Sequence, residues 1–220
     1  LALMYSHGEG VAQSFEISAE LSALAALQGH ASAHYNLGVY YRDGTGVAPS
    51  YEKAIEMFSL AAKQGHANAQ FNLGVLYDNG NGEGVAQSFE KAFELYALAA
   101  NQGHAGAQYN LGYSYEHGEG IAQSFEKAFE LYTLAANQGY ACAQFILGAC
   151  YYDGHGVARS NDMARKWWLK AALQEDEDAI QNLKMLEQEE KTTARRILLM
   201  LLAPTVVVAV HVSRAWKRYR

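Results

Sequence analysis

Eight histidines and two cysteines are the side chains of this 220-residue chain best suited to metal or acid–base chemistry. His30 and His34 are four residues apart, which places two imidazoles on one face of a helix, as in some zinc sites. No third ligand accompanies them at a suitable spacing, and a zinc site needs one. His66 and His104 share the repeat position of His30, with Tyr140 in the fourth copy, so we interpret this position as structural.

No other group in the sequence indicates catalysis. Cys142 and Cys150 are eight residues apart on one predicted helix, about 12 Å by helical rise, which is too far for a disulfide. Neither a G-x-G-x-x-G nor a G-x-x-x-x-G-K phosphate motif occurs, and no strand is predicted before any glycine turn. The carboxylates follow the repeat register, without a pair in distinct environments for acid and base roles. We therefore predict two free thiols, no catalytic residue, no cofactor, no metal ion, and a protein that is not an enzyme.

Charge is distributed unevenly along the chain. The sequence has 17 basic and 23 acidic residues, a formal charge of −6, and half of its residues are hydrophobic. All the acids and ten of the bases precede residue 191, so residues 1–190 carry −13 and residues 191–220 carry +7. An acidic body argues against nucleic-acid binding, and this apolar composition argues against disorder.

The elements that position these side chains form a repeat. Pairs of glycines one residue apart recur at steps of 36 to 38 residues, and pairs of adjacent alanines recur at the same steps. The glycine pairs are Gly8/Gly10, Gly44/Gly46, Gly82/Gly84, Gly118/Gly120 and Gly154/Gly156. A fixed period of this length is typical of stacked supersecondary units.

Each unit is predicted to be two helices joined by a glycine turn. In the third unit, Ala69, Leu73 and Tyr77 repeat at intervals of four, which predicts a first helix over residues 67–77 with an apolar face. Gly74, beside Leu73, would let a neighbouring helix approach closely.

The turn and the second helix of this unit follow from its next residues. The glycines of residues 80–84 end the first helix, and Val85 is expected to insert into the turn. Ser88 is a predicted N-cap for a second helix over about residues 89–101. Serines 14, 50, 124 and 160 occupy the same position. One such hairpin cannot bury its apolar face, so the units must stack.

The repeated residues resemble the Sel-1-like repeat, a relative of the tetratricopeptide repeat with a longer, glycine-rich turn. The shared motifs are A-x-A-Q-[FY]-N-L-G-x-x-Y at residues 67–77 and 105–115, the G-x-G-V turn, a K-A pair in the second helix and an A-A-x-Q-G ending. The resemblance implies an all-α, right-handed superhelical solenoid of units of about 36 residues. We predict an array over residues 1–190, with about five repeats, the first truncated, and a C-terminal capping helix. Residues 191–220 form a separate tail.

In tetratricopeptide arrays, the face of the first helix opposite Leu73 lines a concave groove, and the resemblance implies the same here. We call the residues predicted to bind a partner the aromatic–asparagine row: Tyr35, Asn36, Phe71, Asn72, Tyr109, Asn110, Tyr113 and Phe145. Asparagine can pair with both N–H and C=O of an extended backbone, and aromatic rings add apolar contact. The alternative interpretation is that these rings only pack one repeat against the next.

The charges near the row predict the class of partner. Arg42 is the only base on these faces, while Asp43, Asp78, Glu116 and Asp153 surround the turns. The lysines and arginines with which carboxylate-clamp tetratricopeptide domains bind acidic C-termini are absent. We therefore predict a protein or peptide partner that is neutral or basic, and no nucleic-acid partner.

The tail contains an apolar stretch, residues 197–212, with basic residues on both sides. Sixteen helical residues span about 24 Å, short of the roughly 30 Å hydrocarbon core, although snorkelling arginines could extend the span. A membrane anchor, a buried cap on the last repeat and a non-native C-terminal sequence all remain open. With an anchor, the chain would resemble the membrane-anchored adaptor of the ER-associated-degradation ubiquitin-ligase complex, which is our alternative function. The sequence leaves a cytosolic and an ER location open.

Overall fold

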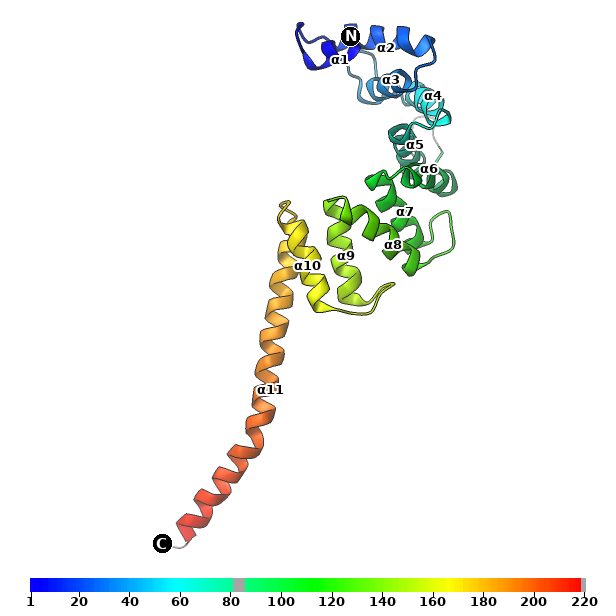
Figure 1. Ribbon diagram of the computed structural model, residues 1–220. Helices are drawn as coiled ribbons and strands as arrows, with labels where there is room; N and C mark the ends of the chain where they lie inside the picture. Colours follow the sequence, from blue (N-terminus) through cyan, green and yellow to red (C-terminus); the bar gives the residue numbers. More distant parts are fainter. Residues whose placement is uncertain (81–85, 219–220) are drawn as a thin grey trace.

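The computed structural model describes the backbone of residues 1–80 and 86–218 and the side chains up to residue 197, apart from residues 81–85. Within these residues the chain forms helices and no strand (Figure 1). The helices are α1 (Ala2–His7), α2 (Phe15–Leu27), α3 (Ala31–Asp43), α4 (Tyr51–Lys63), α5 (Ala67–Asn79), α6 (Phe89–Asn101), α7 (Ala105–His117), α8 (Phe125–Asn137), α9 (Ala141–Asp153), α10 (Asn161–Ala172) and α11 (Glu177–Arg218).

Helices α1 to α10 form five antiparallel pairs that stack into a curved array. Each helix packs mainly against the helices directly before and after it in the chain. In Figure 1, α3, α5 and α7 lie on the inner side of the curve, and α4, α6 and α8 lie on its outer side. The predicted all-α solenoid is confirmed.

Serine caps begin the second helix of every repeat, as predicted. Ser88 has an extended backbone, with φ of −151°, and its Oγ accepts a hydrogen bond from the Lys91 N–H at 3.3 Å. The serines at positions 14, 50, 124 and 160 cap α2, α4, α8 and α10 in the same way. Because this acceptor satisfies a free N–H of the first turn, it fixes where each helix begins. The predicted start and end of α6 are both confirmed.

Glycine ends the first helix of each repeat in the left-handed conformation. Gly80 follows α5 with φ of 55°, and its counterparts after α1, α3, α7 and α9 have φ between 69° and 84°. The predicted role of Val85 in the turn lies outside the described residues. Its counterparts Val47 and Val157 pack against buried clusters.

A second glycine position holds the two helices of one repeat together. A Cβ atom on Gly74 would lie 2.7 Å from Cε1 of Tyr96, and one on Gly112 would lie 2.8 Å from Cε1 of Tyr132. The same pairing joins glycines 38 and 148 to Phe58 and Trp168. The predicted close approach at Gly74 is therefore made by a ring from the second helix of the same repeat.

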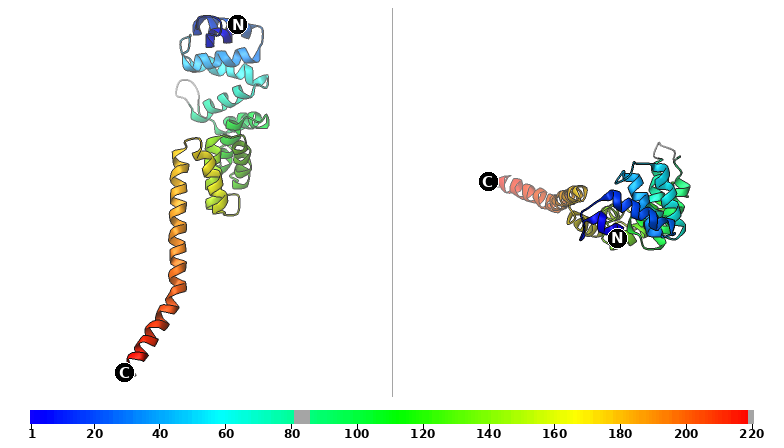
Figure 2. Two further views of the ribbon diagram at one scale, coloured as in Figure 1. Left: turned by 60° about the vertical axis from the view of Figure 1, so that its left-hand side comes forward. Right: turned by 90° about the horizontal axis from the view of Figure 1, so that it is seen from above.

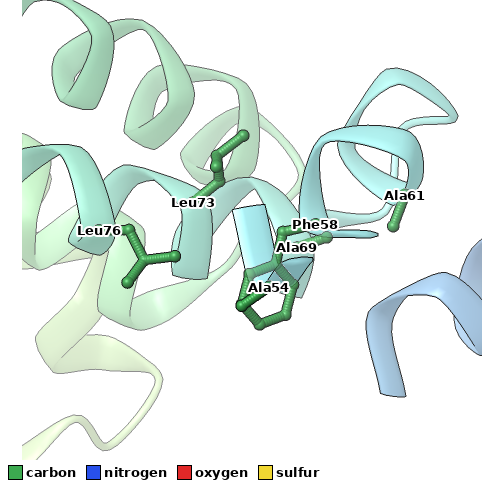
Figure 3. Close-up of a cluster of buried hydrophobic side chains, with 6 residues drawn as sticks. All are labelled: Ala54, Phe58, Ala61, Ala69, Leu73 and Leu76. Atoms are coloured by element: carbon green, nitrogen blue, oxygen red, sulfur yellow. The ribbon is translucent and has the colours of Figure 1, made fainter. Parts of the chain in front are cut away.

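The apolar side chains buried between neighbouring repeats explain why a single hairpin would not be stable alone. Ala54, Phe58 and Ala61 of α4 form one cluster with Ala69, Leu73 and Leu76 of α5, which belong to the next repeat (Figure 3). All six side chains are at most 5% exposed. Removing the neighbouring repeat would expose this apolar surface to water.

A buried glutamine in each of three repeats joins its own repeat to the preceding one. The Gln108 amide donates to the carbonyl of Ala100 at 3.3 Å, and its Oε1 accepts from Gln138 Nε2 at 2.7 Å. The same pattern recurs at glutamines 70 and 144, with partners Ala62 and Gln102 and partners Ala136 and Gln174. His34 occupies this position in the second repeat, and its buried Nδ1 has no hydrogen-bond partner among the described residues.

Helix α11 begins as a further first helix and then leaves the array. Its first turn is capped by Asp176, whose Oδ1 accepts from the Ala179 N–H at 2.8 Å. Ala179 and Leu186 are fully buried, and Arg165 of α10 forms an ion pair with Glu190. Beyond this contact the helix extends away from the stack, as both views in Figure 2 show. The division of the chain at residue 190 stays a prediction.

The apolar stretch at residues 197–212 falls on the outer part of α11, where side chains after residue 197 lie outside the described part. Among the residues that the structure describes, no helix is both long and apolar enough to cross a bilayer. The membrane anchor and the cellular location stay predictions.

Candidate protein-binding surface

The structure puts the aromatic–asparagine row on four successive first helices. Tyr35 and Asn36 lie on α3, Phe71 and Asn72 on α5, Tyr109, Asn110 and Tyr113 on α7, and Phe145 on α9. Three of these helices, α3, α5 and α7, lie on the inner side of the curve (Figure 1).

The rings of the row are neither free nor fully enclosed. Tyr35 and Phe71 stack on His66 and His104, the residues that precede the next first helix, with ring centroids 4.7 and 4.5 Å apart. Tyr109 lies 5.5 Å from Tyr140 in the same relation. All three row rings are half-buried. The repeat-packing interpretation therefore holds for part of each ring, and the remaining surface is open to solvent.

His66 and His104, which stack on the rings of the row, also cap the helices that follow them. Nδ1 of His104 accepts from the Ala107 N–H at 3.0 Å, and Nδ1 of His66 accepts from the Ala69 N–H at 3.3 Å. Burial lowers the pKa of both imidazoles below 6.5. A neutral ring is required because only an unprotonated Nδ1 can accept a hydrogen bond. The predicted structural role of these two residues is confirmed, whereas the exposed His30 makes no such cap bond.

The two tyrosines of α7 differ in their environment. Burial raises the pKa of Tyr109 to about 12, so its phenol stays protonated at neutral pH. Tyr113 is the most accessible ring of the row, at 41% exposure, and it stacks on His117 one turn further along the helix at 3.9 Å. Tyr113 can therefore contact a partner without any change in the buried core.

The asparagines supply polar groups beside the rings. The side-chain amides of Asn36 and Asn72 make no hydrogen bond within the described residues, and both side chains are half-buried. Each amide offers one donor group and one acceptor. A partially buried amide without a protein partner is suited to pair with the backbone of another chain.

The carboxylates near the row are largely engaged within the protein. Asp43 pairs with Arg42 at 2.7 Å, which lowers the pKa of the Asp43 carboxyl. Glu116 accepts a hydrogen bond from the Tyr132 hydroxyl at 2.6 Å, and burial raises the pKa of that phenol. Asp78 accepts from the Tyr96 hydroxyl at 3.0 Å in the same way. Asp78 and Glu116 therefore hold the two helices of their repeats together, whereas the Asp43 pair lies within α3.

The sequence interpretation missed the structural role of the buried glutamines at the repeat junctions, although they stand in the recognised A-x-A-Q motif. The available signal was a polar residue that recurs among alanines at the start of three of the first helices.

The prediction of two free thiols is confirmed, since Cys142 is exposed, Cys150 is buried, and both are free. Burial raises the pKa of the Cys150 thiol to about 12.

Comparisons with known proteins agree with this architecture. The family described as Sel1 repeat matches residues 1–30, 31–66, 67–104, 105–140 and 143–176. A crystal structure of a Sel1 repeat protein from Oxalobacter formigenes is 31% identical, with a TM-score of 0.76, over 83% of this chain and 72% of that chain.

A second similar structure is c5321, a protective antigen of uropathogenic Escherichia coli strains that displays an SLR fold. It is 33% identical, with a TM-score of 0.79, over 86% of this chain and 40% of that chain. The comparison with curated proteins found no match. Five consecutive segments match the Sel1 repeat, and together they cover most of the length of the chain. The chain therefore belongs to the Sel1 repeat family.

Proposed function

We propose that this array is a non-enzymatic scaffold that binds an unstructured protein segment along the aromatic–asparagine row. Sel1-repeat solenoids are generally non-enzymatic scaffolds for protein interactions. The finer proposal concerns the surface used and the chemistry of the segment bound.

The observation that carries the proposal is a repeated pair of residues. Each pair has a half-buried aromatic ring beside an asparagine whose side-chain amide makes no hydrogen bond within the described residues. Phe71 and Asn72 are adjacent on α5, and Tyr35 and Asn36 are adjacent on α3 in the same register. An extended chain has one N–H and one C=O in every residue, and the amides can satisfy both. The rings would cover its side chains at a low entropic cost.

The charge of the surface favours a neutral or basic segment. Arg42 is already paired with Asp43, so it is not available to bind an acidic group. Residues 1–190 carry −13 overall, which would attract positive segments and repel acidic ones.

A peptide-display library selected against the full chain tests this proposal. We expect the enriched peptides to be neutral or basic, and their dissociation constants to rise about tenfold or more when Asn36→Ala, Asn72→Ala and Tyr113→Ala are combined. Fluorescence anisotropy with the labelled peptides measures the change.

The matched control replaces two exposed asparagines outside the row, Asn101→Ala and Asn137→Ala, at the ends of α6 and α8. This variant should bind the peptides as the unmodified chain does. Equal weakening in the row variant and the control, or enrichment of acidic peptides, would refute the proposal.

A further inference from the structure

The repeats differ in the side chain at the fifth residue of the second helix, which packs against the next repeat. In the third repeat this residue is Phe93, whose ring meets the edge of Tyr115 in the next repeat at 5.4 Å and 80°. In the fourth repeat it is Phe129, which meets Tyr151 at 5.3 Å and 84°. The second repeat has Ile55 there, which packs in the same cluster as Tyr77.

The first repeat has Ala19 at this position, and a hollow of about 390 Å³ lies above it between α2 and α3. Ala19 forms the floor and is 3% exposed. Ala23 of α2 and Leu37 and Tyr41 of α3 line the hollow, and Val47 of the following turn completes it. Tyr41 corresponds to Tyr115 and Tyr151, so here the tyrosine has no ring from the preceding repeat to pack against.

The wall formed by the turn is held in place by the backbone. Gly46 has φ of 73° and lies directly on the backbone of Phe15 and Glu16, where a Cβ atom would have no room. The turn therefore cannot move inward to fill the space left by the small side chain of Ala19.

The rim of the hollow is negatively charged. Glu16 and Glu20 of α2 both line it, both are exposed, and neither forms an ion pair within the described residues. The ammonium group of Lys53 lies 5.1 Å from the ring centroid of Tyr41. Two carboxylates against one ammonium group leave the site with a net negative charge.

We infer that this hollow is a binding site for an aromatic side chain of a partner protein that is flanked by lysine or arginine. The ring would take the place that Phe93 and Phe129 take in later repeats and contact Tyr41, and the flanking bases would pair with Glu16 and Glu20. The site lies between α2 and α3 and uses none of the residues of the aromatic–asparagine row, so it is independent of the proposed function.

Three blocked tripeptides separate the contributions of ring and charge. The full chain, labelled with nitrogen-15, is titrated with acetyl-Lys-Phe-Lys-amide, acetyl-Lys-Ala-Lys-amide and acetyl-Glu-Phe-Glu-amide. We expect saturable NMR shifts at the amides of Ala19, Ala23 and Val47 with the first peptide only. Shifts confined to other regions, or equal shifts with all three peptides, would overturn the inference.

Two variants test the site directly. Ala23→Leu introduces the side chain that the fifth repeat has at the equivalent Leu169, and it should weaken binding about tenfold or more by occupying the hollow. Glu16→Gln combined with Glu20→Gln should weaken binding roughly threefold or more, as expected for two exposed ion pairs. This second variant changes no buried group, so it stays informative if Ala23→Leu fails to fold.

The matched control is Glu90→Gln combined with Glu94→Gln, the same two positions on α6, where Phe93 fills the equivalent space. This control and the row variant Asn36→Ala with Asn72→Ala should leave tripeptide binding unchanged. An equal loss in the control would show a general charge effect and refute the site. Sedimentation of the chain as a dimer, with no tripeptide shifts, would assign the hollow to a second copy and also refute it.

Discussion

Replacing Gly112 with alanine tests the glycine–ring contact that joins the two helices in the second to fifth repeats. The new Cβ atom would lie 2.8 Å from Cε1 and 2.9 Å from Cδ1 of Tyr132, and 3.3 Å from the carbonyl oxygen of Ala128. Ordinary contacts begin near 3.4 Å. Tyr132 cannot turn away, since it is 1% exposed and its hydroxyl donates to Glu116.

The expected cost follows from two opposing effects. Overpacking a close-packed core costs about 1–3 kcal/mol, and the loss of a glycine from a helix interior returns up to about 1 kcal/mol. Because the ring has no free space to move into, we expect a net loss of about 1–2 kcal/mol in the free energy of unfolding. Urea unfolding followed by far-ultraviolet circular dichroism measures it.

Gly106→Ala on the same helix is the matched control. Its Cβ atom would lie 3.3 Å from its nearest neighbours, and the corresponding residues in other repeats are Ser32, Asn68 and Cys142. This change should be neutral or stabilising by up to about 1 kcal/mol. If Gly112→Ala behaves like the control, the contact is not the constraint that we describe.

A double-mutant cycle isolates the pair. The first repeat has Ala2 and Ser22 in place of the glycine and the ring, so Gly112→Ala with Tyr132→Ser copies a pairing that the chain already uses. We expect the double variant to be less destabilised than the sum of the single ones, by about 1 kcal/mol or more. Strict additivity would refute the argument.

Three further predictions concern other parts of the array. Leu73→Ala should lower the free energy of unfolding by about 2–5 kcal/mol, since the residue is 5% exposed in the core, and a loss below about 1 kcal/mol in urea unfolding would contradict this. Gln108→Ala should cost about 1–3 kcal/mol by the same measurement, because the Ala100 carbonyl and the Gln138 amide lose their partner. The pKa of His104 is lower in the folded chain than its ordinary 6.5, so the unfolded chain binds more protons between these values. Its contribution to stability is complete above pH 6.5 and is lost as the pH falls through the folded pKa. Thermal unfolding at several pH values should therefore show a smaller loss on acidification for His104→Asn, and an unchanged pH profile would contradict it.

Local features of the fold could be read from the sequence because the interactions that produce them are local. Ser88 accepts from an N–H three residues away, and Gly80 takes a backbone conformation that few other residues adopt. Ala69 and Leu73 share a face by helical periodicity alone. The period of 36 residues then implied stacking, because each pattern left an apolar face uncovered.

The surface of the row could not be fully predicted, since it depends on how one repeat crosses the next. Phe71 belongs to the face opposite Leu73, yet it is half-buried because His104, the residue that precedes the next first helix, stacks on its ring. Sequence spacing gives no crossing angle, and a small change in that angle would expose or cover this ring. The hydrogen bonds of Gln108 could not be predicted for the same reason, because its partners Ala100 and Gln138 come from two different repeats.

The glycine–ring contact also bears on how such an array can lengthen. Gly112 and Tyr132 both lie inside one 36-residue unit, so duplication of the gene segment encoding that unit copies both halves of the contact together. Within the copy, this contact would form without a compensating substitution elsewhere. The glutamine at each junction takes one of its two partners from the preceding unit, and three of the units already have this glutamine in the same place. Growth by whole units therefore preserves this contact, whereas insertion of half a unit would separate a ring from its glycine.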